Sequence, residues 1–469
     1  MTFNSYVFAA FFIIVLAVYN LPALGWRSQK IWLLITSYVF YAAWDPVFIV
    51  LVWLSTVVDW ASARLIHSAR TKTRKRALLV GSLIVNLGVL GYFKYGNFLL
   101  ANLVGGLHAL GIDYQPAPFD IILPIGISFY TFHSLSYTLD VYLGRTTPDD
   151  SLLDFALYVS FFPALVAGPI LRSSQFLPQC KTPRRTTGAL LGWGLAMMVL
   201  GLFEKQVLAD VALAPAADKL FSLSGAVSPL DAWIGTLAFT GQIFFDFAGY
   251  STCAIGVALC LGFSMPDNFR FPYAAVGFSD FWTRWHISLS SWLRDYLYIP
   301  LGGNRIGPAR TYVNLMLTML IGGLWHGASW TFVAWGGLHG AYLVGERAIR
   351  RLPLRIGAAS RLAATFVTFV LVTFAWVFFR ATSFDRAFAV VKGLTFVTSA
   401  KHVINKGDVR VVAFVIAGLL ATHVAMRERR LEDVVRRTPW FVRALVIAAM
   451  LVGIVIMQGE DRAFIYFQF

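Results

Sequence analysis

Long apolar runs recur from one end of this 469-residue chain to the other. A helix that spans a membrane needs about 20 mostly apolar residues, because hydrocarbon offers no partner to an open backbone N–H or C=O. Only 13% of the residues are charged, whereas soluble domains carry about 25%. The sequence therefore predicts an all-helical protein that crosses a membrane many times.

The candidate membrane spans follow from these runs. Several runs are too short or too polar for a full crossing, so we expect about 11 transmembrane helices, with the others re-entrant or interfacial. The first run has neither a basic stretch before it nor a small-residue cleavage site, which favours a retained helix over a signal peptide. With no fixed-period repeat and no long linker, residues 1–469 are expected to form one membrane domain. The runs are 6–24, 31–44, 47–63, 77–93, 121–137, 153–170, 189–203, 233–247, 253–263, 312–324, 332–344, 362–379, 411–424 and 444–457.

The basic residues predict how the chain is oriented. The net charge is +15, and Lys and Arg gather in three loops between apolar runs, at 64–76, 347–361 and 427–443. Loops rich in Lys and Arg stay on the cytoplasmic side of a membrane, which places both termini outside. No recognised nucleic-acid-binding module accompanies the charge, so we expect contact with membrane lipid and none with nucleic acid.

The cysteines give no sign of metal or disulfide chemistry. The chain has three of them, Cys180, Cys253 and Cys260, and they form no C-x-x-C pair. Neither a metal site nor a disulfide framework is therefore expected.

Residues 281–305 form the least ordinary stretch of the sequence, FWTRWHISLSSWLRDYLYIPLGGNR. Read as one helix, the stretch has an aromatic face opposite a polar face, which suits a membrane surface or a protein cavity better than lipid. An interfacial anchor with an aromatic belt is one interpretation. His286 complicates it, because its helical neighbours are mostly apolar. The aromatic face carries Trp285, Leu289, Trp292 and Tyr296, and the polar face carries Arg284, Ser288, Ser291 and Asp295.

A second histidine lies in IGGLWHGASW, residues 321–330, where glycines stand on both sides of His326 at the end of an apolar run. An ionisable side chain at membrane depth usually faces a cavity or a partner, because its exposure to lipid is costly. The glycines allow a broken helix and a close approach of substrate to the backbone. A packed histidine in a glycine-rich helix contact is the alternative interpretation. For His339, a structural role is favoured.

RWHISLSSWLRDYLYIPLGGNR followed by LWHG resembles the signature of the membrane-bound O-acyltransferases, the MBOAT family. Further motifs agree over nearly the whole chain and in the family's order. They are similar to the bacterial branch that contains the alginate acetyltransferase membrane subunit. The motifs include GYFKYGNF, LPIGISFYTFHSLSYTLDVY, FFPALVAGPILR, FFDFAGYS, MPDNFRFPY, WVFFRA and the closing FIYFQF.

The resemblance implies a fold in which helices ring a central funnel or tunnel in the bacterial inner membrane. It implies that an acetyl group passes from a cytoplasmic donor, acetyl-CoA, to hydroxyls of an exported polysaccharide, directly or through a periplasmic acetyltransferase partner. The choice of acetyl-CoA rests on the resemblance alone, because no phosphate-cradling motif of the G-x-x-x-x-G-K-[ST] type is present. A donor carried on a protein is the alternative. No bound cofactor is expected.

Acyl transfer to a hydroxyl needs a base, a group that stabilises the developing oxyanion, and a site from which water is excluded. His326 is assigned as the base, and His286 as the residue that orients a substrate or donates to the oxyanion. A serine acyl-enzyme lacks its usual support, because no Gly-x-Ser-x-Gly elbow is present. For the two acids of the site, structural ion pairing is the alternative. The expected substrate contacts are Arg284, Asp295, Asp246, Trp285 and Trp325.

Two other classes of function stay open on the sequence alone. A transporter or flippase for a glycan or a lipid-linked precursor also needs many spans and intramembrane polar residues. The paired internal repeats that are common in transporters are not found in this sequence. A noncatalytic membrane scaffold would not require histidines in glycine-broken segments.

Overall fold

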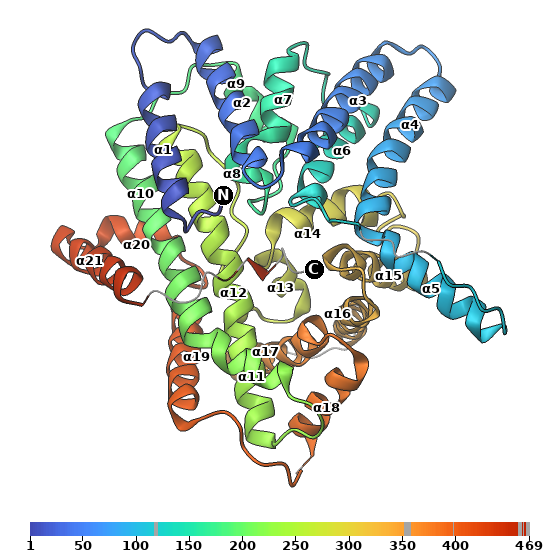
Figure 1. Cartoon of the computed structure of the whole chain (residues 1–469), viewed down its shortest axis with the longest axis vertical. Coiled ribbons are helices and arrows are strands. Elements are labelled where there is room, and N and C mark those ends of the chain that lie inside the picture. Colours follow the sequence, from blue (N-terminus) through green and yellow to red (C-terminus); the bar gives the residue numbers. More distant parts are fainter. Residues whose placement is uncertain (117–120, 351–357, 397, 458–461, 463, 466–469) are drawn as a thin grey trace. The chain divides into compact units, whose positions relative to one another are not determined.

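The computed structural model describes residues 1–116, 121–350, 358–396, 398–457, 462 and 464–465. These residues form helices, turns and loops without a strand, which confirms the all-helical prediction for them. The chain divides into two compact units. Unit 1 comprises residues 1–195 and 254–266, and unit 2 comprises residues 196–253 and 267–469. Figure 1 shows the helices coloured along the sequence.

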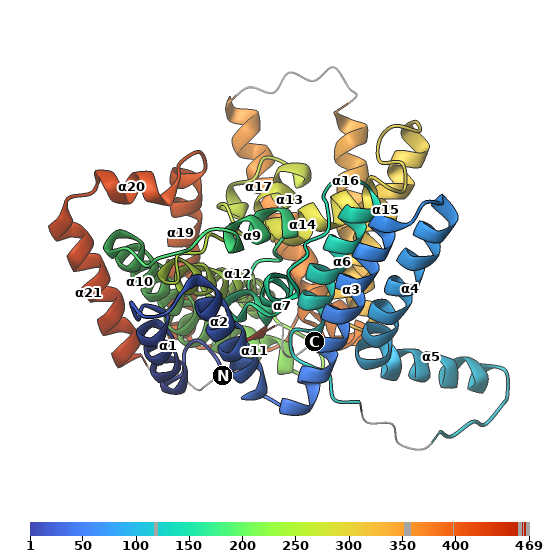
Figure 2. The same cartoon turned by 90° about the horizontal axis from the view of Figure 1, so that it is seen from above.

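Unit 1 consists mainly of apolar helices that pack against helices both near and far in the sequence. α3 and α4 lie side by side, and α6 packs against both (Figures 1 and 2). Its helices are α1 (Tyr6–Tyr19), α2 (Trp26–Ala42), η1 (Pro46–Phe48), α3 (Ile49–Ser68), α4 (Lys72–Leu90), η2 (Gly91–Tyr95), α5 (Gly96–Ala109), α6 (Ile127–Tyr142), α7 (Leu152–Ser160), α8 (Phe162–Leu165) and α9 (Ser173–Cys180).

A buried carboxylate joins three helices of unit 1. Asp59 of α3 is fully buried. Asn86 Nδ2 of α4 and Thr138 Oγ1 of α6 each donate a hydrogen bond to its carboxylate at 3.0 Å, and the hydroxyl of Ser82 in α4 donates a further one. A buried polar group is costly unless it is hydrogen-bonded, so these bonds fix how the three helices pack.

Unit 2 contains the segments of the predicted site. α15 packs along α16, and α16 packs against α17. α10 (Gly188–Leu202) and α12 (Pro229–Cys260) contribute residues to both units. The other helices of unit 2 are η3 (Phe203–Leu213), α11 (Ala214–Ser222), η4 (Pro272–Ala274), α13 (Phe278–Arg284), α14 (Ile287–Leu293), η5 (Arg294–Tyr298), α15 (Pro308–His326), α16 (Trp330–Ile349), α17 (Ala358–Arg380), α18 (Phe384–Thr395), α19 (Lys406–Met426), α20 (Leu431–Arg437) and α21 (Trp440–Ile456).

Five helices in the described part of the chain are long and apolar enough to cross a membrane. This finding supports a multi-pass membrane protein. The number of about 11 spans, the orientation of the chain and the single domain over residues 1–469 stay predictions. The five helices are Pro46–Ser68, Lys72–Ala109, Pro229–Cys260, Ser360–Arg380 and Lys406–Met426, and two shorter apolar helices are Tyr6–Tyr19 and Trp440–Ile456.

Three of the expected spans differ from the structure. The runs 233–247 and 253–263 are not separate, because α12 continues through the polar residues between them. The hydroxyl of Ser251, in that polar stretch, accepts a hydrogen bond from Asn268 Nδ2 at 3.0 Å. This buried hydroxyl therefore has a partner outside α12, and the helix can continue through it. The run 153–170 is not one helix either, since it breaks between α7 and α8. Pro163 lacks the N–H that would continue the hydrogen-bond ladder of α7.

Candidate active site

His286 lies at a break between two short helices. α13 ends at Arg284, Trp285 is extended, and α14 begins at Ile287. His286 itself adopts the left-handed conformation, with φ 43° and ψ 55°. The prediction of one amphipathic helix over 281–305 is therefore wrong, since this conformation stops a right-handed helix.

Asn268 supports the backbone at this break. Its carbonyl oxygen accepts a hydrogen bond from the N–H of Ile287 at 2.9 Å, and its Oδ1 accepts from the hydroxyl of Ser288 at 2.6 Å and from the N–H of Ser288 at 3.3 Å. A non-glycine residue in the left-handed region costs about 1 kcal/mol or more, and such bonds offset that cost. Sequence reasoning missed Asn268, because MPDNFRFPY is recognisable as a family motif but gives no sign of this contact.

His326 is the last residue of α15, and the extended backbone of Gly327 ends the helix there. Its imidazole is almost fully buried and packs edge-on against the rings of Trp325 and Trp335, each with a centroid separation of 5.0 Å. The ring centroids of His326 and His286 lie 6.4 Å apart. The structure thus brings together three of the predicted site residues, His286, Trp325 and His326.

The glycines around His326 serve helix packing as well as the helix break. A Cβ on Gly323 would overlap the carbonyl oxygen of Phe332, and a Cβ on Gly336 would overlap that of Met319. α15 and α16 therefore approach each other more closely than larger residues would allow. The glycine-rich contact and the broken helix, which were alternatives on the sequence, occur together.

Arg284 and Asp295 engage charged neighbours. The Nε of Arg284 donates to Asp280 at 2.7 Å, and Arg427 binds the same carboxylate at 2.8 Å. Burial alone would raise the pKa of Asp280, but the N–H of Val276 and the two guanidinium groups outweigh it and hold that pKa below its usual value. Asp295 pairs with the Nε of Arg294 at 2.8 Å.

Asp246 and Trp285 are also held by protein groups. Asp246 pairs with Lys205 Nζ at 2.5 Å and accepts a hydrogen bond from the N–H of Ile465 at 3.0 Å. The indole of Trp285 is fully buried, with its centroid 4.9 Å from that of Trp376. For Asp246 and Asp295 the ion pairs fit the structural role that the sequence left open for the acids. The role of these two acids, Arg284 and Trp285 as substrate contacts stays a prediction.

His339 lies in an aromatic environment of its own. Its ring is fully buried and packs against Trp335 at 4.8 Å and Trp282 at 5.1 Å between centroids. Neither ring nitrogen has a hydrogen-bond partner among the described residues. Across those same residues, no three His, Cys, Asp or Glu side chains are grouped so that they could hold a metal ion.

The apolar helices define a multi-pass membrane protein, in which His286 and His326 are buried at helix ends. Residues 14–384 match the sequence profile of the membrane-bound O-acyltransferase family, MBOAT. The chain belongs to this family and is an O-acyltransferase.

Three curated relatives are similar over most of their length. The probable alginate O-acetylase AlgI of Pseudomonas aeruginosa is 42% identical over 441 residues, which cover 91% of this chain and 82% of the relative. The probable alginate O-acetylase AlgI of Pseudomonas putida is 39% identical over 499 residues, with full coverage of both chains. The peptidoglycan O-acetyltransferase of Helicobacter pylori is 39% identical over 394 residues, 78% of this chain and 73% of the relative.

Proposed function

We propose that this O-acyltransferase resides in the bacterial inner membrane and acetylates hydroxyls of an exported polysaccharide, with acetyl-CoA as the cytoplasmic donor. The observation that carries the proposal is the buried pair His286 and His326, in a chain whose relatives are named for O-acetylation of alginate and peptidoglycan. The acceptor hydroxyl belongs to the polysaccharide or to a periplasmic acetyltransferase that completes the transfer.

His326 acts as the general base in this proposal. It takes the proton from the acceptor hydroxyl as the oxygen attacks the thioester carbonyl, and a C–O bond forms. The tetrahedral intermediate then collapses, the C–S bond breaks, and the proton passes from His326 to the departing thiolate. The reaction is balanced without a metal ion or an external oxidant.

His286, the second histidine of the pair, acts on the acyl group or the acceptor in this proposal. The 6.4 Å between the two ring centroids allows both imidazoles to contact one small acyl group. An N–H of His286 would donate to the developing oxyanion or would orient the acceptor. The left-handed backbone of His286 and the bonds from Asn268 support a fixed position for this ring.

The surroundings of the pair favour transfer over hydrolysis. His326 packs against Trp325, Trp335 and Phe379, and His286 lies edge-on to Phe247 at 4.6 Å between centroids. Aromatic rings on these sides exclude water, which would otherwise compete with the acceptor for the thioester.

Reconstitution separates this function from that of a transporter or flippase. Purified protein in vesicles is given acetyl-labelled acetyl-CoA on the side of the basic loops and an oligosaccharide acceptor on the other side. We expect labelled oligosaccharide with the wild type and none with His326→Gln. Passage of unmodified oligosaccharide without label transfer would contradict the proposal and favour the transporter.

A further inference from the structure

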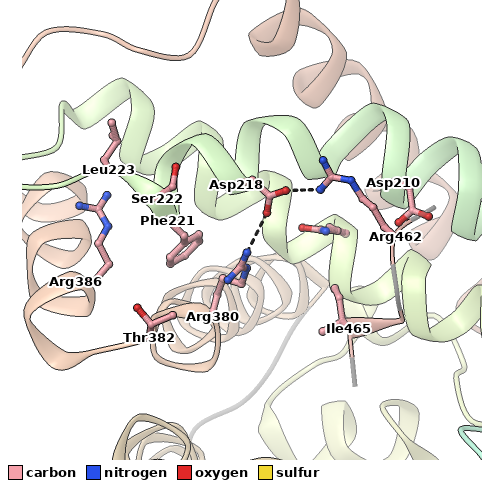
Figure 3. A pocket seen from close by; sticks show the side chains of 11 residues that line it. Asp210, Asp218, Phe221, Ser222, Leu223, Arg380, Thr382, Arg386, Arg462 and Ile465 are labelled. Atoms are coloured by element: carbon pink, nitrogen blue, oxygen red, sulfur yellow. Dashed lines mark hydrogen bonds and ion pairs between the residues drawn. The ribbon is translucent and has the colours of Figure 1, made fainter. Parts of the chain in front are cut away.

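A charged cavity of about 600 Å³ lies within unit 2, in the part of the chain that contains α11, α17 and α18, and neither His286 nor His326 is among its lining residues. Arginines line it from three separate segments: Arg380 at the end of α17, Arg386 in α18, and Arg462. Figure 3 shows Arg380 and Arg462 directed toward Asp218 of α11, with Arg386 at the other end of the cavity.

The cationic groups at this cavity outnumber the carboxylates. Asp218 pairs with Arg380 at 2.9 Å and with Arg462, while Arg386 forms no ion pair among the described residues. The Nη groups of Arg386 instead donate to the carbonyl oxygens of Leu220 and Gly225. Its positive charge is therefore available to an anion.

The acids behind the cavity do not change this balance. Asp210 lines the cavity and pairs with Lys205 at 2.8 Å, and Lys205 also pairs with Asp246. Together with Asp218 these are three carboxylates. The four cations Lys205, Arg380, Arg386 and Arg462 exceed them by one charge.

Two buried polar atoms point independently to a ligand. Arg386 is 8% exposed and Gln242 is 6% exposed, and both line the cavity. Among the described residues, the Nε of Arg386 and the Oε1 of Gln242 have no hydrogen-bond partner. Buried polar atoms are nearly always hydrogen-bonded. A molecule in the cavity that accepts from Arg386 Nε and donates to Gln242 Oε1 would supply both missing hydrogen bonds.

Arg386 Nε and Gln242 Oε1 would both be paired by an anion that also carries hydroxyl groups. A carboxylate matches the planar fork of a guanidinium group and can accept from its Nε. A sugar hydroxyl can donate to Gln242 Oε1, and the hydroxyls of Ser222 and Thr382 lie in the same lining. The volume is in the range of small-molecule sites, about 300–1,000 Å³, and exceeds what a bare inorganic anion needs.

The predicted topology places the cavity on the external side. The basic loop 347–361 precedes α17, so Arg380 at the far end of α17 is external. α19 ends before the basic loop 427–443, so its first turn is external as well. Asp408 in that turn pairs with Lys219 of α11 at 2.6 Å, and α11 forms one wall of the cavity.

From these observations, we propose that the cavity is a subsite for a carboxylate-bearing sugar unit of the acceptor polysaccharide. The inference rests on the proposed function, since it specifies an acidic acceptor for the same enzyme. It adds a recognition site on the predicted external side of unit 2, with a lining that does not include the histidine pair.

Calorimetric titration of the full-length protein in nanodiscs tests this subsite. The probe is a 1,4-linked hexuronate tetrasaccharide, and a neutral tetrasaccharide of the same length is the control. We expect the hexuronate to bind, and the neutral sugar to bind about tenfold more weakly or not at all, because it lacks the charged hydrogen bond to Arg386.

Gln242→Glu is the main variant, since it keeps the shape of the side chain and adds a negative charge to the cavity that would bind the carboxylate of the ligand. We expect about tenfold weaker hexuronate binding. Lys401→Gln is the matched control, because Lys401 is exposed on the same predicted side and does not line the cavity. Its affinity should equal that of the wild type. Thermal melting checks that each variant is folded.

The outcomes separate this inference from the proposed function. Three results would each overturn the subsite, even if acetyl transfer were intact. They are equal binding of hexuronate and neutral sugar, binding of inorganic phosphate in place of hexuronate with equal affinity, and wild-type affinity of Gln242→Glu for hexuronate. His326→Gln should bind hexuronate normally while its acetyl transfer is lost. A wild-type protein that binds hexuronate at this cavity but transfers no acetyl group would leave the subsite standing and overturn the proposed function.

Discussion

One oxygen of Asn268 binds Ser288 twice. Asn268 Oδ1 accepts a hydrogen bond from the hydroxyl of Ser288 at 2.6 Å and another from the N–H of Ser288 at 3.3 Å. The same side chain donates to Ser251 of α12 at 3.0 Å. These bonds connect α12 to the first turn of α14, directly after His286. The position of the His286 ring therefore depends on a side chain from a different segment.

Asn268→Ala should impair catalysis through this connection. Loss of the bonds to Ser288 releases the backbone at His286, and misplacing a catalytic group by about 1 Å can cost on the order of 10² in rate. We expect kcat to fall by about that factor while KM for the donor changes little. Asn268→Asp keeps the acceptor oxygen and should retain more activity than Asn268→Ala. Wild-type kcat in a folded Asn268→Ala protein would show that the connection does not position His286.

Three of the buried histidines of unit 2, His286, His326 and His339, should differ in their effect on acyl transfer. His326→Ala or His326→Gln removes the base, which is typically worth 10² to 10⁴ in rate. His286→Ala should impair turnover by less, because orientation or one oxyanion contact is lost. His339→Ala should matter least, since its ring packs against Trp335 and Trp282. The test is the rate of label transfer from acetyl-CoA by variants with the same melting temperature as the wild type.

Neither a transport path nor a scaffold predicts this order of effects. A well-folded His326→Ala protein that transfers acetyl groups at the wild-type rate would remove His326 from the mechanism. The paired assignment of His286 would then lose its basis, because it depends on the 6.4 Å separation from His326.

The parts of this structure that local patterns determine could be predicted from the sequence. The apolar runs 312–324 and 332–344 correspond to α15 and α16, and the glycine after His326 correctly indicated a helix end there. Apolar periodicity and backbone freedom act within a few residues, so they are readable along the chain.

Contacts between distant segments could not be predicted in the same way. The break at His286 depends on Asn268, and the pairing of Asp246 depends on Lys205 and on Ile465. Taken alone, residues 281–305 have an aromatic face and a polar face, a pattern that predicts an amphipathic helix. The bonds from outside the stretch favour the left-handed residue that interrupts it.

The contact between α15 and α16 predicts a sharp difference between two adjacent glycines. A Cβ on Gly336 would overlap the carbonyl oxygen of Met319, whereas a Cβ on Gly337 would meet only Leu320 Cδ2 at 3.6 Å. Gly336→Ala should therefore destabilise the protein by about 1–3 kcal/mol. Gly337→Ala should be neutral or stabilising by about 0.5–1 kcal/mol, because alanine favours the helix.

Thermal unfolding of both variants in the same detergent measures this difference, with the melting temperature as the readout. Equal melting temperatures for Gly336→Ala and Gly337→Ala would contradict the close approach of the two helices. A lower melting temperature for Gly337→Ala than for Gly336→Ala would contradict it as well.

Asp280 should contribute to stability in a pH-dependent way. Its pKa is lower in the folded protein than in the unfolded chain, so its stabilising contribution is fully present above the unfolded value of about 4 and is lost as the pH falls through the folded value. Asp280→Asn should lower the melting temperature at neutral pH and should reduce the loss of stability in acid. Melting curves between neutral pH and about pH 3 test this. Parallel curves for the variant and the wild type would show that Asp280 does not contribute to the acid dependence.

The last prediction concerns topology, on which the external location of the arginine cavity depends. The three native cysteines are buried, so in intact cells a new thiol on the surface would be the main site of reaction with a maleimide that does not cross membranes. Arg74 and Arg429 are exposed and lie in or next to basic loops, whereas Lys401 is exposed just before the predicted external end of α19. We expect Lys401→Cys to be labelled in intact cells, and Arg74→Cys and Arg429→Cys to be labelled only after the inner membrane is permeabilised. Labelling of Arg74→Cys in intact cells would place the N-terminal half the other way round. Protection of Lys401→Cys would move α17, α18 and the cavity to the cytoplasmic side, where an exported polysaccharide cannot reach them.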